Sequence, residues 1–159
     1  MGTSAEILKE REKYCPEKLL ADAIVAAFHA DVMLIYNDNK NFRDEKFMYV
    51  TLNILDHSYN RQFILYVKGK DNPSLSFNDH DYEYYGLDSS QKLCSVAFVE
   101  EIYGAEEILF RFIYEYLKIN PEDYFCVDDY EWVYRWEDMQ KLKSFPYDPD
   151  WCYKDPKLI

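Results

Sequence analysis

Residues 47–67, FMYVTLNILDHSYNRQFILYV, decide the fold class of this chain. Successive side chains of a strand point to opposite faces, and in the first part of this stretch apolar residues alternate with Tyr49, Thr51 and Asn53. A half-buried strand is therefore expected from Phe47 to Leu55. A polar loop follows, and then a second apolar run over 63–67 that ends at Gly69. The two runs predict an antiparallel hairpin.

Before the hairpin, the sequence predicts a helix from Glu17 to Ala30. Pro16 precedes it, and proline suits the first turn of a helix. Four-residue spacing predicts a buried line on this helix, formed by Leu20, Ile24 and Phe28. The short apolar run at 32–36, closed by turn-forming residues at 37–39, is typical of a strand.

After the hairpin, the clearest pattern is a second helix that begins near Gly104. Glu106 and Glu107 suit the positive end of a helix dipole. One apolar stripe at helical spacing follows, formed by Ile108, Leu109, Phe112, Ile113, Tyr116 and Leu117. Pro121 disfavours helical backbone at Asn120, so the helix is expected to end there.

Weaker strands are expected at 75–77, 82–85, 93–99 and 124–127. The segment after them is ambiguous. Its aromatic residues at 130, 132, 134 and 136 alternate as in a strand, yet Asp128 and Glu131 have capping-box spacing, and Trp132, Trp136 and Met139 fit a helix. We favour a strand followed by a short helix over 137–143.

Residues 144–159, SFPYDPDWCYKDPKLI, contain three prolines, which disfavour regular helix and central strand. We expect an extended aromatic C-terminal tail that is held against the domain by its ring side chains, with Trp151 mostly buried. The chain as a whole, residues 1–159, is expected to form a single α+β domain, an antiparallel sheet with helices packed on one face.

The charge is strongly acidic, with 18 Lys and Arg against 30 Asp and Glu and a net charge of -12. Residues 100–159 contribute most of it, with 15 acids against 7 bases, and they also hold 15 of the 29 aromatic residues. Phosphate backbones repel such a surface, and no run of Lys or Arg offsets it, so we expect no direct nucleic-acid binding.

Localisation follows from features that the sequence lacks. Residues 5–18 are too polar for a signal peptide, and the apolar stretch at 23–28 is far shorter than a membrane span. The four cysteines form no C-x-x-C pair. We therefore expect a cytoplasmic protein with reduced cysteines, no membrane contact, no cofactor and no metal.

One segment combines acids with aromatic rings densely enough to suggest a partner site. The candidate contact residues are Asp128, Asp129, Tyr130, Glu131, Trp132, Tyr134, Glu137 and Asp138. Either the rings belong to the core and the acids to a solvated edge, or exposed rings anchor a partner while the acids steer it. The composition of acids and aromatics is similar in kind to that of small immunity proteins that neutralise basic toxins or nucleases. That resemblance implies a basic protein partner and assigns no residue roles.

The sequence thus favours a non-enzymatic acidic protein-binding domain, an immunity or antitoxin-like inhibitor, and no residue is predicted to be catalytic. Two alternatives stay open. The first is a small-ligand or hydrolytic enzyme domain with a pocket near His57 or His80, although neither histidine belongs to a known ligand pair. The second is a DNA mimic, whose carboxylates would have to imitate rows of phosphates.

Overall fold

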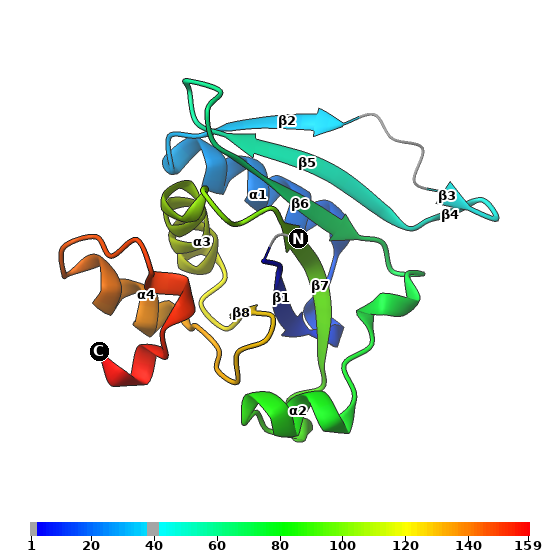
Figure 1. Cartoon of the computed structure of the whole chain (residues 1–159). Helices are drawn as coiled ribbons and strands as arrows, with labels where there is room; N and C mark the ends of the chain where they lie inside the picture. Colours follow the sequence, from blue (N-terminus) through cyan, green and yellow to red (C-terminus); the bar gives the residue numbers. More distant parts are fainter. Residues whose placement is uncertain (1–2, 38–41) are drawn as a thin grey trace.

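The computed structural model describes residues 3–37 and 42–159 and shows an antiparallel sheet of six strands (Figure 1). The strand order is β2-β5-β6-β7-β1-β8. The strands are β1 (Ala5–Glu10), β2 (Met33–Asn37), β5 (Tyr49–Leu55), β6 (Gln62–Lys68), β7 (Leu93–Glu100) and β8 (Tyr124–Val127), with a small separate hairpin of β3 (Phe42–Arg43) and β4 (Lys46–Phe47). The helices are α1 (Pro16–His29), α2 (Asp79–Tyr85), α3 (Glu106–Ile119) and α4 (Trp136–Lys143).

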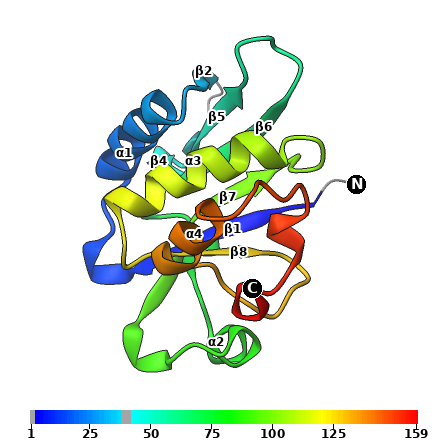
Figure 2. The same ribbon diagram turned by 90° about the vertical axis from the view of Figure 1, so that its left-hand side faces the viewer.

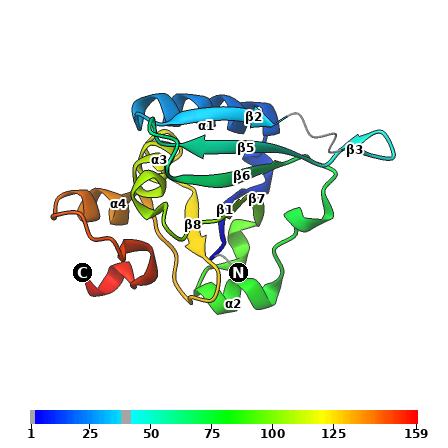
Figure 3. The same ribbon diagram turned by 45° about the horizontal axis from the view of Figure 1, so that its top comes forward.

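The helices α1 and α3 cover one face of this sheet, and α4 lies against α3 (Figure 2). The apolar residues of the sheet that point toward them form the main core, where Phe63 of β6 meets Phe112 of α3 at a ring-centroid distance of 5.7 Å. The short helix α2 lies apart from the other helices, near the β7-β1-β8 end of the sheet (Figure 3). This arrangement confirms the predicted α+β class.

The predicted hairpin and the second helix are both confirmed. Strands β5 and β6 pair antiparallel, with Leu52 opposite Leu65 and Thr51 opposite Tyr66. All six residues of the predicted stripe on α3 are buried. Gly69 ends β6 where a β-carbon would lie 2.1 Å from the carbonyl oxygen of Phe47, so no larger residue fits there without movement.

The strand β1, which the sequence analysis did not predict, lies inside the sheet between β7 and β8. Its sequence AEILKE carries three charged residues, so the apolar pattern is weak. Ala5 and Ile7 point toward the helices and are fully buried, whereas Glu6 points to the opposite face. The strand is stabilised by pairing on both edges, which no local sequence pattern reports.

The predicted buried line of α1 is wrong at two of its three residues, since only Leu20, which is partly buried, packs against the core. Ile24 and Phe28 are exposed, at 58% and 79% of their surface, and the buried face instead carries Leu19 and three small residues, Ala23, Ala26 and Ala27. Alanines let the helix axis come close to the sheet and to α3, because no long side chain separates the backbones. Which face of α1 is buried therefore depends on how closely the sheet and α3 approach the helix, and not on hydrophobicity alone.

Three of the weaker assignments also need correction. Residues 73–75 form a short 3-10 helix, and the predicted strand at 82–85 is the end of α2, which Asn78 and Asp81 cap reciprocally. The predicted strand over 130–136 is reduced to a single bridge between Phe125 and Tyr134, because α4 already begins at Trp136. The strands predicted at 93–99, 124–127 and 32–36 are confirmed as β7, β8 and β2.

The C-terminal segment packs against α3 through Trp151, as predicted. This side chain is 1% exposed, its Nε1 donates to the carbonyl of Glu106 at 2.9 Å, and its ring lies 5.2 Å from that of Phe110. The tail is not wholly extended, because Trp151–Tyr153 and Pro156–Leu158 form single 3-10 turns. None of the helices in the described ranges is long and apolar enough to cross a membrane.

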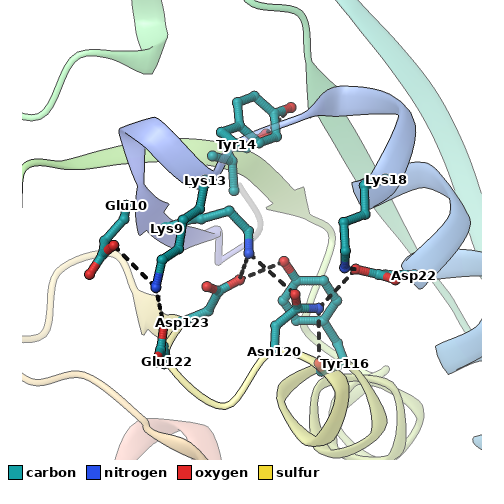
Figure 4. A network of polar contacts seen from close by, with 11 residues as sticks. Lys9, Glu10, Lys13, Tyr14, Lys18, Asp22, Tyr116, Asn120, Glu122 and Asp123 are labelled. Carbon is teal, nitrogen blue, oxygen red and sulfur yellow. Dashed lines mark hydrogen bonds and ion pairs between the residues drawn. The ribbon is translucent and has the colours of Figure 1, made fainter.

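A polar network joins β1, α1 and α3 at one end of the core (Figure 4). Asp123, which is 4% exposed, accepts a hydrogen bond from the hydroxyl of Tyr116 at 2.7 Å and lies 3.1 Å from Nζ of Lys9. The amide of Asn120 donates to Asp22 at 3.1 Å. Burial raises the pKa of Asp123. The polar groups of this network are hydrogen-bonded or ion-paired with one another, so we infer that the network stabilises the fold rather than binding a ligand.

Candidate functional site

The sheet face opposite α1 and α3, here called the open face, is only partly covered. Helix α2 packs on its β7-β1-β8 end, where Tyr82 contacts a cluster around Leu8 and Leu93. Over β5, β6 and β7 the face carries a row of aromatic rings. The ring of Tyr66 lies 5.5 Å from that of Tyr49 and 6.1 Å from that of Phe98. The sheet register produces this row, because Tyr66 stands opposite Phe98 and opposite Thr51, two residues from Tyr49.

This row forms the floor of a depression of about 560 Å³, which we call the sheet groove. Its ionisable residues are Glu6, Lys68 and Glu100. Asn72 and Ser74 form the rim, and Asn72 is held there by a hydrogen bond of 2.9 Å from its amide to the carbonyl of Met48. The volume lies in the range of pockets that bind small molecules or single side chains of a partner.

Lys68 and Glu6 are connected through Ser95. The ammonium group of Lys68, on a residue that is 6% exposed, donates to Ser95 Oγ and to the carbonyl of Ser74, both at 3.0 Å. Ser95 Oγ in turn donates to Glu6 Oε1 at 2.8 Å. Burial lowers the pKa of Lys68. Burial raises the pKa of Glu6, and the negative charge of Asp128 raises it further. Both groups are therefore shifted toward their neutral forms, the usual consequence of incomplete solvation.

Tyr66 links the aromatic row to the third ionisable residue. Its hydroxyl donates to Glu100 Oε2 at 3.1 Å. Burial raises the pKa of Tyr66 to about 12, and the neighbouring Glu100 contributes to the shift. The hydroxyl therefore stays protonated at neutral pH and fixes the position of the carboxylate at the edge of the groove.

A second depression, here called the acidic hollow, adjoins the sheet groove at Glu6. It has a volume of about 300 Å³ and lies between α2 and the segment after β8. Four carboxylates line it, those of Glu6, Asp81, Asp128 and Asp129, together with His80, Tyr84 and Tyr85. None of these lining residues is a lysine or arginine. The hollow is thus a place of concentrated negative charge with aromatic walls.

Local structure explains how two of these acids are positioned. The backbone amide of Asp128 donates to the carbonyl of Ser4 at 2.9 Å, and the Ser4 hydroxyl donates to the Asp128 carboxylate. Asp129 has a φ of 74°, a left-handed conformation that reverses the chain after β8. Both acids are therefore held by the loop.

The eight residues predicted as partner contacts differ in their exposure and in their contacts. Asp128 and Asp129 line the acidic hollow, and Glu131 and Glu137 are exposed. Asp138 accepts a hydrogen bond of 2.8 Å from the backbone of Arg135 and caps α4. The remaining three predicted residues are the aromatic ones.

Tyr134 is fully buried, so its ring belongs to the core and cannot itself touch a partner. Its hydroxyl accepts a hydrogen bond of 3.0 Å from Nε1 of Trp132. Trp132 lies against Tyr130, with ring centroids 4.8 Å apart, and both are partly buried. The alternation that suggested an exposed aromatic strand instead reflects one core residue that supports two half-buried ones.

The two histidines of the alternative interpretation are separated. His80 lines the acidic hollow, whereas His57 lies on the exposed turn between β5 and β6, with Nε2 2.9 Å from Asp31. Within residues 3–37 and 42–159, no group of three His, Cys, Asp or Glu side chains is placed to hold a metal ion.

Sequence reasoning missed Glu6, Lys68 and Glu100, because each lies on a strand far from the others along the chain. One signal was available. The polar face of the predicted hairpin contains Tyr49 and Tyr66, residues large enough to pack yet carrying hydroxyl groups. Such a face is suited to partial exposure rather than to a second covering layer.

No protein-family model matches this chain, no curated protein matches its sequence, and no solved structure matches its fold at a significant level. The function is therefore argued from the residues themselves.

Proposed function

We propose that this protein is a non-enzymatic binding domain that receives a basic segment of a partner protein on the sheet groove and the acidic hollow, as an immunity or antitoxin-like inhibitor would. The observation that carries the proposal is the convergence of Glu6, Asp81, Asp128 and Asp129 on one hollow, beside a row of aromatic rings.

The energetics favour a cationic occupant. Glu6 is half-buried, and burial raises its pKa, so the hollow lacks enough positive charge to stabilise the ionised carboxyl group. An arginine or lysine side chain from a partner would supply that charge. The same side chain could lie over the face of Tyr66 or Tyr49, where a cation gains roughly 0.5–2 kcal/mol.

The net charge of -12 supports the proposal at longer range. A strongly acidic surface attracts a basic protein before contact and raises the association rate by about 10 to 10³-fold, an effect that salt reduces. The groove then selects the residue that docks, because its walls and floor accept only a limited shape.

A peptide titration tests the proposal. Octa-arginine is added to ¹⁵N-labelled protein at low salt, and the backbone shift changes are mapped. We expect the largest changes around Glu6, Asp128 and Asp129, and weaker binding as salt is raised. The triple variant Glu6→Gln, Asp128→Asn, Asp129→Asn should lose about tenfold or more in affinity, equivalent to about 1.4 kcal/mol.

A matched control has the same change of net charge at other places. The variant Glu12→Gln, Glu45→Gln, Asp150→Asn alters three exposed carboxylates that line neither depression. We expect it to lose far less affinity than the first variant. If the two triple variants weaken binding equally, and the shift changes spread over the whole acidic surface, the proposed site is wrong.

A second candidate is a small-ligand or hydrolytic domain, favoured by the opposite pKa shifts of Glu6 and Lys68 in one groove. Glu6 would act as the general acid or base and Lys68 as the charged anchor. Hydrolysis of 4-nitrophenyl esters that disappears in Glu6→Gln, with a pH profile set by one carboxyl group, would support it. For the DNA-mimic alternative, the test is competition with duplex DNA for a DNA-binding partner.

A further inference from the structure

A separate cavity lies between α3, α4 and the C-terminal segment, away from both depressions of the open face. It has a volume of about 400 Å³, and most of its wall is apolar or aromatic. Its buried lining residues include Trp151 and Leu142, Phe110 is partly buried, and Phe145 and Tyr147 are about half exposed. Trp151 is held in the cavity wall by its hydrogen bond to the carbonyl of Glu106.

Two cationic and two acidic side chains also line this cavity, together with Ile159, whose backbone oxygen accepts a hydrogen bond from Lys141. The two kinds of charged side chain differ in their pairing. Glu107 lies 3.2 Å from Arg61, and Asp148 lies 2.7 Å from Lys154, so each acid is already neutralised by a cation outside the cavity. Within the described parts of the chain, neither Arg111 nor Lys143 has a carboxylate within 4.0 Å. The unneutralised charge at this cavity is therefore positive, although the protein as a whole is acidic.

The two cations differ in their surroundings. The Nε atom of Arg111 is buried and has no hydrogen-bond partner. Lys143 Nζ lies 4.0 Å from the centroid of the Tyr114 ring, a cation-π contact with a residue that does not itself line the cavity. A buried donor without a partner costs stability, and an anionic acceptor would remove that cost.

We propose that this cavity binds a small aromatic carboxylate. The ring of such a ligand would pack against Phe110 and Trp151, and its carboxylate would accept hydrogen bonds from Arg111 and Lys143. The aromatic lining favours a flat ring, and the two cations favour a single negative group. The proposal does not depend on the proposed function, because the two sites share no residue.

One competing arrangement lies within the protein itself. Glu115, one turn after Arg111 on α3, has a buried Oε2 atom without a hydrogen-bond partner. A change of rotamer could let Glu115 neutralise Arg111, which would leave only Lys143 to meet the carboxylate of a ligand. The variant Glu115→Gln distinguishes the two possibilities. Ligand binding becomes stronger if Glu115 pairs with Arg111, and it stays unchanged if Glu115 does not.

The experiment uses three ligands that differ only in the polar end, 3-phenylpropionate, 3-phenylpropanol and 3-phenylpropylamine, titrated into the full chain by calorimetry. We expect saturable binding of the carboxylate, with the alcohol and the amine at least about tenfold weaker. Shifts of the Trp151 indole NH in ¹H–¹⁵N spectra should report the same saturation. Equal affinity for the carboxylate and the alcohol, or no saturable binding of the carboxylate, would overturn the proposal.

Variants assign the charge to the predicted residues. Arg111→Gln should weaken binding of 3-phenylpropionate by about tenfold or more while leaving the alcohol unaffected. Lys118→Gln is the matched control, because Lys118 is an exposed cation on the same helix and does not line the cavity. Well-dispersed spectra of both variants establish that they fold. If Lys118→Gln weakens binding as much as Arg111→Gln does, the selectivity comes from general charge and the assignment fails.

Discussion

The two faces of the sheet are built from the same strands, yet they differ in chemistry. On the face under α1 and α3, Leu52, Phe63 and Leu65 are almost completely buried and purely apolar. On the open face, the neighbouring residues include Tyr66 and Lys68, which keep polar groups partly desolvated. A sheet face that is covered by helices favours apolar side chains. A face that no helix covers can keep ionisable side chains, at a cost in stability. The open face therefore carries its polar groups at a cost in stability that the covered face avoids.

The largest expected effect is on the covered side. Trp151→Ala should lower the free energy of unfolding by about 3–5 kcal/mol, because the ring is buried and its cavity cannot close around an alanine. Urea melts measure this. Phe145→Ala, in the same tail but half exposed, is the control and should change stability by no more than about 0.5 kcal/mol. A chain ending at Lys143 should lose at least as much as Trp151→Ala. Parental midpoints for both would show that the tail is outside the core.

The next effect concerns the pair on the open face. Lys68→Met should cost about 1–3 kcal/mol at pH 7, because it leaves Glu6 half-buried without its cation and removes the donor to Ser95. The double variant with Glu6→Gln should recover most of this loss. Melts of the four proteins give the coupling energy. Additive effects would mean that the two residues do not interact.

A smaller effect is expected in the pH dependence of stability. Because the pKa of Glu6 is raised on folding, the folded state binds this proton more tightly than the unfolded state. The contribution of Glu6 is therefore fully present below the unfolded value of about 4.5 and is lost as pH rises through the folded pKa. Glu6→Gln removes this loss, so its stability relative to the parent should increase over that window. Urea melts of the parent and of Glu6→Gln at a series of pH values across that window measure the difference.

The smallest effect tests the corrected face of α1. Phe28→Ser should change stability by no more than about 0.5 kcal/mol, because the ring is exposed. Ala27→Leu, at the adjacent but buried position, should cost about 1–3 kcal/mol through overpacking. Chemical denaturation of both variants measures the two changes in the free energy of unfolding. The opposite order would restore the face predicted from the sequence, with Leu20, Ile24 and Phe28 inward.

The candidate site could be predicted only in part. Asp128 and Asp129 were identified, since a run of acids is visible in sequence, and the structure places both in the acidic hollow. Glu6 was missed, although it lies in both depressions. It comes from a strand with a weak pattern, and its importance arises from Asp128, Lys68 and Ser95, which are distant in the chain.

Two parts of the fold could be predicted from local sequence patterns, because those patterns are strong. The hairpin of β5 and β6 follows from alternation, and α3 follows from its apolar stripe and its acidic first turn, because period and dipole act within a few residues. Tertiary structure alone decided the place of β1, the buried face of α1, the burial of Tyr134 and the meeting of Glu6 with Lys68. These features depend on the size and charge of whatever packs opposite, and the chain brings those partners together only when it folds.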